Sequence, residues 1–243
     1  MKRFLLVVAI LVLMGYLAFT ALYFKDNMQD KVCENFIVLV RDSIDKKFIQ
    51  TKDIENLLRK EKLHPVDKPL SSINTLEMEE AIMANKLVKS VEVYSTQDGS
   101  IVASIRQRNP VMRVISNTDG SYYIDSERER MPISQNYTVY LPVATGNITE
   151  EFAKNELYDF VMFVSKSSSW DAWIEQIVVG QNQKVKIVPR AGDFKVSLGT
   201  LDDYEEKLSK LKLFIEKGLN TVGWNRYSEI SLEYNNQVVC TMK

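Results

Sequence analysis

The sequence predicts an α+β protein, with an N-terminal transmembrane helix, a small β-α-α-β-β module and a larger, mostly antiparallel β domain with two helices. Three observations predict this. They are an uncharged apolar run near the N-terminus, mixed helix and strand periodicity as far as Pro110, and a series of short alternating strands beyond it. The expected boundaries are 1–3 for a cytoplasmic end, 4–24 for the transmembrane helix, 25–34 for a linker, 35–110 for the first module and 111–243 for the second.

The apolar run predicts a retained membrane anchor. No charged residue occurs from Phe4 to Phe24, and at about 1.5 Å per residue a helix over this run spans roughly 30 Å, the thickness of the hydrocarbon core. A cleaved signal peptide would end its shorter apolar region at a small-x-small site, whereas this run continues past Ala21. Lys2 and Arg3 precede the run, so we expect the N-terminus inside and the C-terminal region outside.

The first module is expected to be a three-stranded sheet with two short helices on one face. Thr51 is the expected N-cap of the first helix, and Ser71 or Asn74 is expected to open the second. The apolar face of the second helix is expected to be Leu76, Ala81, Ile82 and Leu87. The expected strands are Asn35–Arg41, Val88–Tyr94 and Ile101–Arg106, and the first helix is expected to end near Lys62.

The second module is expected to contain many short strands and two helices, because turn residues separate brief apolar alternations. The expected helices run from about Thr149 to Ser165 and from about Leu201 to Lys217, each with an apolar stripe of core spacing. The expected strands are Val111–Ile115, Ser121–Ile124, Val139–Leu141, Ile177–Val179, Val185–Val188, Phe194–Leu198, Glu229–Tyr234 and Val238–Met242.

The composition argues against an enzyme or a nucleic-acid-binding protein. A net charge of −1 gives no concentrated basic face, and the nine glycines form no phosphate-binding loop. The only histidine, His64, is expected in a loop next to Pro65, without a positioned partner. Cys33 and Cys240 lack metal-ligand spacing, and whether they pair is left open. We therefore expect no catalytic residue, no cofactor, no metal site and no small-molecule substrate.

The last expected strand, Val238–Met242, is a candidate for binding another chain. A sheet edge presents unpaired N–H and C=O groups to which an incoming strand can add. Little sequence follows this strand to cover it, although pairing on both sides or blunting by Lys243 is the alternative. The alternation of Ile230, Leu232 and Tyr234 is expected to put these side chains on one face beside that strand.

Several strings, in this order and spacing, resemble the FtsQ/DivIB family of bacterial cell-division proteins. The last strands of the first module and an Arg-x-Pro-Val-like junction are similar to the end of that family's POTRA domain. A Tyr-x-Ile-Asp stretch, a Leu-Pro-x-x-x-Gly stretch and a Val-x-Leu-Gly segment with a Lys-Leu pair are similar to its β domain. The strings are Val88–Tyr94, Ile105–Val111, Tyr123–Asp125 with Met131-Pro132, Leu141–Gly146, and Val196–Gly199 with Lys207-Leu208.

The resemblance implies a POTRA domain at 35–110, a β domain at 111–243 and a single-pass protein of the bacterial inner membrane at the division septum, with its folded region extracytoplasmic. It implies a non-catalytic divisome scaffold that links early and late division proteins. Its expected partner is an FtsB/FtsL-like coiled-coil pair, which would bind by strand addition. The implied contact residues are Tyr234, Val238, Val239, Cys240, Thr241 and Met242. The alternative is a POTRA-bearing anchor or chaperone-like module in protein export or envelope assembly, which tandem repeats would favour.

Overall fold

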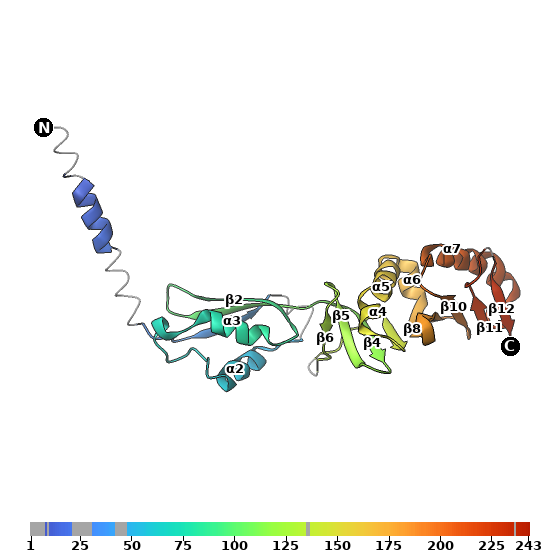
Figure 1. Ribbon diagram of the computed structural model, residues 1–243, viewed down its shortest axis with the longest axis horizontal. Helices are drawn as coiled ribbons and strands as arrows, with labels where there is room; N and C mark the ends of the chain where they lie inside the picture. Colours follow the sequence, from blue (N-terminus) through green and yellow to red (C-terminus); the bar gives the residue numbers. More distant parts are fainter. Residues whose placement is uncertain (1–7, 9, 21–30, 42–47, 135–136, 236) are drawn as a thin grey trace. The chain divides into compact units, whose positions relative to one another are not determined.

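The computed structural model describes residues 8, 10–20, 31–41, 48–134, 137–235 and 237–243 (Figure 1). It divides into two compact units, Met1–Gln107 and Arg108–Lys243. Residues 8 and 10–20 are helical. Within the described residues, no helix combines the length and the apolar character needed to cross a membrane. The predicted span over 4–24 includes 4–7, 9 and 21–24, which lie outside the described part of the chain.

The first unit has the predicted β-α-α-β-β order. Its strand order is β1-β3-β2, with β1 parallel and β2 antiparallel to the central β3. The helices supply buried Ile54, Leu58, Met78 and Ile82 to its core. The elements are β1 Phe36–Val40, α2 Thr51–Lys60, a short 3-10 turn Leu70–Ser72, α3 Thr75–Met83, β2 Val88–Ser95 and β3 Ile101–Gln107.

Helix starts and faces in this unit differ in part from the prediction. Gln50, not Thr51, is the N-cap of α2, and its backbone N–H donates to Asp53 Oδ2 at 3.0 Å. Asn74 is the N-cap of α3, as one of the two predicted starts. The prediction that Leu76 lies on the apolar face was wrong, because its side chain is 62% exposed. Met78 and Ile82, four residues apart, form the buried face of α3 instead.

The second unit is built on one nine-stranded sheet in the order β12-β11-β10-β9-β8-β7-β4-β5-β6. Most neighbouring strands are antiparallel, as predicted, and the parallel pairs are β4–β7, β7–β8 and β10–β11. The strands are β4 Pro110–Ser116, β5 Gly120–Asp125, β6 Arg130–Met131, β7 Val143–Gly146, β8 Ile174–Val179, β9 Val185–Pro189, β10 Lys195–Gly199, β11 Tyr227–Ser231 and β12 Val239–Met242.

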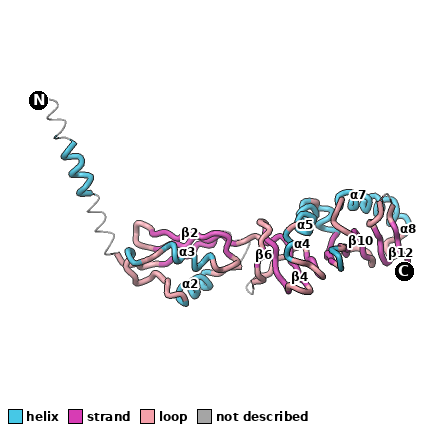
Figure 2. Tube along the Cα trace, viewed as in Figure 1, coloured by secondary structure: helices cyan, strands magenta, loops and turns pink. Residues whose placement is uncertain are grey.

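Helices pack along this sheet, and Figure 2 shows them on one side of the strands. Phe160 and Val161 of α5 and Leu208 and Leu211 of α7 lie in one buried cluster with Ile230 of β11. A cluster this large makes burial the main source of stability. The elements are α4 Glu150–Lys154, α5 Glu156–Lys166, α6 Ser168–Trp173, the short 3-10 turn Gln181–Gln183, α7 Tyr204–Phe214, a π-helical turn Ile215–Leu219 and α8 Asn220–Val222.

Several predicted element bounds in this unit were wrong. The helix expected over 149–165 is interrupted at Asn155, whose φ and ψ are −111° and −99°. The strand expected at Val139–Leu141 does not form, and β7 begins only after Pro142, which has no N–H to donate to a ladder. Helix α6 was not predicted. Strand β11 ends at Ser231, so it does not extend to Tyr234 as expected.

A buried ion pair fastens the start of the second unit to the turn after β5. Arg108 Nη1 lies 2.7 Å from Asp125 Oδ2, and the Asp125 side chain is 2% exposed. The other carboxylate oxygen accepts hydrogen bonds from the backbone N–H groups of Glu127 at 2.9 Å and Glu129 at 2.8 Å. Asp125 therefore closes this turn and neutralises Arg108 at the same time.

Candidate protein-interaction site

Strand β12 lies at the free edge of the nine-stranded sheet. It pairs with β11 antiparallel, Ile230 opposite Cys240 and Ser231 opposite Val239, and the described residues place no strand on its other side (Figure 1). The final predicted strand therefore forms, and it forms at an edge. Lys243 Nζ binds Asp193 at 2.8 Å, so this basic side chain is drawn toward the protein.

Two hydrogen bonds show which backbone groups of β12 face outward. Lys243 N–H donates to Arg226 O at 3.3 Å, so the Lys243 backbone faces the segment that leads into β11. Leu232 N–H donates to Ser197 O on β10 at 2.8 Å, so the preceding residue, Ser231, faces β12 and its partner Val239. Backbone groups alternate sides along a strand, so Thr241 and Val239 face β11, whereas Cys240 and Met242 face the free edge. The free edge therefore offers the N–H and C=O groups of Cys240 and the N–H of Met242, whose C=O accepts a hydrogen bond from Ser228 Oγ of β11 at 3.4 Å.

The predicted contact residues fall into two sets around this edge. Val238 and Cys240 pack partly against the core cluster, and Met242, on the same face by alternation, is 56% exposed. Val239 is 41% exposed, and Thr241 is exposed beside it on the opposite face. Both cysteines of the chain are free thiols, and burial raises the pKa of the Cys240 thiol.

Tyr234 lies in the turn before β12, and its side chain is 54% exposed. The expectation that it shares a face with Ile230 and Leu232 was wrong, because both of those side chains are fully buried. The strand ends at Ser231 and the chain bends, which breaks the alternation before Tyr234. An exposed tyrosine beside a free edge is a frequent anchor in protein interfaces.

The Glu233 side chain in this turn contacts Ser197 of β10 and Lys184, which directly precedes β9. One Glu233 carboxylate oxygen accepts from Lys184 Nζ at 2.8 Å and the other from Ser197 Oγ at 2.8 Å. These bonds lower the pKa of Glu233, with Lys184 as the largest cause. Gly199, at φ 70°, leaves room for this side chain, because a Cβ there would lie 2.9 Å from Glu233 Cγ. These contacts fix the Glu233 side chain, which directly precedes Tyr234 in the chain.

A groove beside β12 extends the site onto α7. Leu213 is 52% exposed on its wall, next to partly buried Phe214 and Val238. Lys210 and Lys217 stand on the rim, and Lys210 Nζ also donates to Tyr234 O at 3.4 Å. Sequence reasoning missed this groove. The available signal was Leu213, an apolar residue outside the buried stripe of its helix.

His64, the only histidine, packs edge to face on the Phe36 ring with centroids 5.6 Å apart. Burial lowers its pKa, with Arg59 as the next cause. This contact is that of a packing residue within the first unit. In the described part of the chain, no group of three or more His, Cys, Asp or Glu side chains is arranged to hold a metal ion.

Comparison with known families accounts for both units. A family model described as "FtsQ/DivIB, C-terminal related" matches residues 109–241, and one described as "POTRA-like domain" matches residues 31–106. No curated protein matches the chain. The first match covers more than half of the 243 residues. The chain therefore belongs to the FtsQ/DivIB family and combines a POTRA-like domain with that family's C-terminal related region.

Proposed function

We propose that this protein is a non-catalytic scaffold of the bacterial division machinery that receives a strand from a membrane-anchored coiled-coil partner of the FtsB/FtsL kind. The observation that carries this proposal is the free edge of β12, where the N–H and C=O of Cys240 and the N–H of Met242 point outward. A partner strand would gain main-chain hydrogen bonds there, and side-chain contacts would supply specificity. FtsQ/DivIB membership supports a role in division.

The surroundings of the edge support a partner with both apolar and acidic groups. Met242 and Tyr234 are each more than half exposed, and the groove with Leu213 is lined by Gln237 and Val238, which lie between these two residues in the chain. Glu206 also lines the groove and lies 3.8 Å from Lys210 Nζ, so Lys217 is the basic side chain there that favours an acidic group on the incoming chain. An amphipathic helix followed by a strand has this chemistry, which suits a coiled-coil protein.

We further propose that the protein is anchored by a single membrane span at the division septum, with the folded region outside the cytoplasm. The uncharged run from Phe4 to Phe24 supports this, as do Lys2 and Arg3 before it. A reporter fused after Lys243 should be active only outside the cytoplasm. Activity inside the cytoplasm, or a mature N-terminus near Lys25, would contradict the topology.

Proline substitutions in β12 test the strand addition. Met242→Pro removes an outward N–H and should weaken partner binding at least about tenfold, because proline also blocks a neighbouring strand. Thr241→Pro removes an inward N–H, so it should destabilise the β11–β12 pair instead. Val239→Pro also removes an inward N–H, so loss of binding in this variant would not distinguish a blocked edge from a destabilised β11–β12 pair.

The measurement uses the full chain in native membranes. A photo-crosslinking residue at exposed Val239 would first identify the partner, and binding of the purified pair would then be titrated alongside a melting curve. A Met242→Pro protein that melts normally yet binds normally would end the strand-addition proposal. Crosslinking only to proteins without a coiled coil would end the partner assignment.

Tyr234→Ala gives a second test, with Tyr94→Ala as its matched control. The two tyrosines are 54% and 44% exposed, and Tyr94 lies in the first unit. Loss of an aromatic anchor costs about 2 kcal/mol, or roughly 30-fold in affinity. Tyr94→Ala should leave binding unchanged. Equal effects of the two substitutions would contradict the role of Tyr234.

A further inference from the structure

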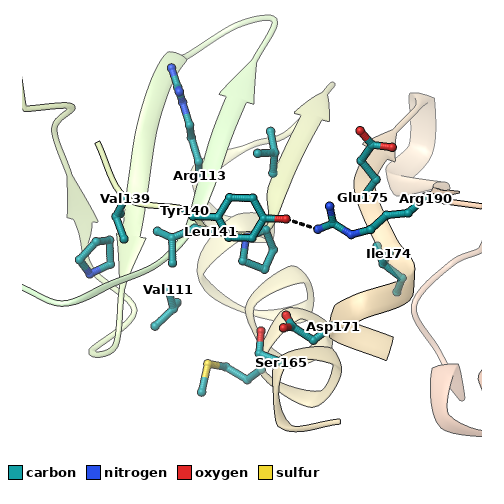
Figure 3. A pocket seen from close by; sticks show the side chains of 14 residues that line it. Val111, Arg113, Val139, Tyr140, Leu141, Ser165, Asp171, Ile174, Glu175 and Arg190 are labelled. Atoms are coloured by element: carbon teal, nitrogen blue, oxygen red, sulfur yellow. Dashed lines mark hydrogen bonds between the residues drawn. The ribbon is translucent and has the colours of Figure 1, made fainter. Parts of the chain in front are cut away.

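The cavity at the start of β7 is lined by charges that water reaches. It measures about 610 Å³, and in Figure 3 Arg190 reaches the Tyr140 hydroxyl while the Arg113 side chain points away from both. Asp171, Glu175 and Arg190 on its wall are exposed, so water competes for these charges. A more specific contact, to a backbone group of an edge strand, lies in the first unit, on the outer side of β2.

Strand β2 is an edge of the three-stranded sheet, and no strand of the described residues lies on its outer side. In the central strand β3, Ile101 N–H donates to Asn35 O at 2.9 Å, and Ile105 O accepts from Arg41 N–H at 3.0 Å. Ile101 and Ile105 therefore direct these backbone groups toward β1. Because backbone groups alternate sides along a strand, the even-numbered residues of β3 face β2.

The same alternation identifies the outward groups of β2. Tyr94 is the partner of Val102, so the even-numbered residues of β2 around Tyr94 face β3. Val91 and Val93 therefore direct their N–H and C=O groups to the outer edge. Unpaired backbone groups on an edge strand of eight residues are a template for pairing with another chain.

Glu79 of α3 occupies one of these outward groups. Its Oε1 accepts from Val93 N–H at 2.6 Å, and the Glu79 side chain is half-buried. Figure 1 shows α3 running beside β2, and buried Met78 and Ile82 fix the helix that carries Glu79. Hydrogen bonds to a carboxylate are among the stronger ones in proteins, so an added strand must first displace a strong acceptor.

We propose that Glu79 holds this edge closed against β2 of a second copy of the chain. Two copies related by a two-fold axis beside Val93 would exchange the N–H and C=O groups of Val93 in an antiparallel pair. The same pairing would set Glu92 opposite Tyr94 of the second copy, so no like charges would meet there. The amide that this pairing needs is the one that Glu79 holds. The proposal does not depend on the β12 edge, which belongs to the other unit.

Hydrogen exchange in the unchanged chain gives the first test. Val93 N–H, held by Glu79, should exchange at least about tenfold more slowly than the equally outward Val91 N–H. Equal exchange of the two amides would overturn the proposal.

Substitutions at Glu79 test the closure in the full chain, purified in detergent, by sedimentation over a range of concentrations. Glu79→Ala frees the Val93 amide, so this variant should dimerise at least about tenfold more tightly than the unchanged chain. Glu79→Gln keeps a carbonyl acceptor at the same place, so it should behave like the unchanged chain. Glu80→Ala removes an exposed carboxylate from the same helix and should also change nothing.

Two further variants separate the hydrogen bond from charge and from folding. Glu79→Asp keeps the charge but is one methylene shorter, so it should dimerise as Glu79→Ala does, and it replaces that variant if alanine unfolds the unit. Val91→Pro, added to Glu79→Ala, removes an outward N–H and should restore the monomer, with a melting curve as the check on folding. Folded Glu79→Ala and Glu79→Asp chains that stay monomeric up to about 100 µM, equal dimerisation of Glu79→Gln and Glu79→Ala, or dimers that survive Val91→Pro would overturn the proposal.

Discussion

Replacing Asp125 by alanine should destabilise the second unit strongly. The change removes an ion pair of 2.7 Å to Arg108 and two backbone hydrogen bonds in the following turn. Breaking a buried pair costs about 3–5 kcal/mol, because the remaining charge is left unpaired. The Arg108 side chain is 19% exposed, so water compensates in part and the lower end of the range applies. We expect a loss of about 3 kcal/mol.

Urea unfolding followed by tryptophan fluorescence measures this loss directly. The three tryptophans, Trp170, Trp173 and Trp224, all lie in the second unit, so the signal reports that unit alone. With a slope of about 2 kcal/mol per molar urea, the midpoint should fall by roughly 1.5 M. Asp125→Asn keeps the side-chain volume and one acceptor, so it should cost less.

A double-mutant cycle tests the cause. Arg108→Ala alone should destabilise the unit, but it should cost little once Asp125 is alanine, because the two side chains act as one pair. A shift below about 1 kcal/mol for Asp125→Ala, or additive losses in the cycle, would refute the assignment of stability to this buried pair.

Three further predictions concern the same unit. Lys184 holds the pKa of Glu233 below its usual 4.5, so the stabilisation from this contact is present above that value and is lost as the pH falls through the lowered pKa. In melting curves from pH 7 to about 3, Glu233→Gln should therefore lose less stability than the unchanged protein. Burial raises the pKa of Tyr122 to about 12, so the stability of the unit should fall between about pH 10 and 12. Tyr122→Phe should remove this fall without loss of stability at pH 7, since the hydroxyl has no hydrogen-bond partner among the described residues. Gly146→Ala should unfold much of the unit in a thermal melt, because its Cβ would lie 2.1 Å from Val179 O.

The first unit was predictable because each of its elements has a simple local signal. Asn74 is a strong N-cap residue, and short alternating runs mark β2 and β3. The errors arose where a neighbour decides the outcome. Val139–Leu141 has strand composition, but it stays outside the ladder ahead of Pro142, and Leu76 is apolar yet finds no buried position on α3. Composition does not contain this tertiary information.

The candidate site was predictable as a segment but not as a geometry. The pattern of Val238–Met242 indicated a strand, and β12 does form at an edge. Which amides point outward depends on the register with β11, which no local pattern sets. The role of Glu233 depends on Lys184, a residue 49 positions away, so sequence reasoning had no means to distinguish this carboxylate from an ordinary surface charge.

The strand order has a consequence for how the binding edge forms. From β7 to β12, strands that follow one another in the chain are also neighbours in the sheet. Each new strand can therefore add to a surface that already exists, and loop closure stays local, which favours fast folding. Among the described residues β12, like β6 at the other edge, pairs with one neighbour, so it should open before the central strands. Transient opening of β12 would then remove the edge that accepts the partner, and hydrogen exchange at Thr241 would report how often this happens.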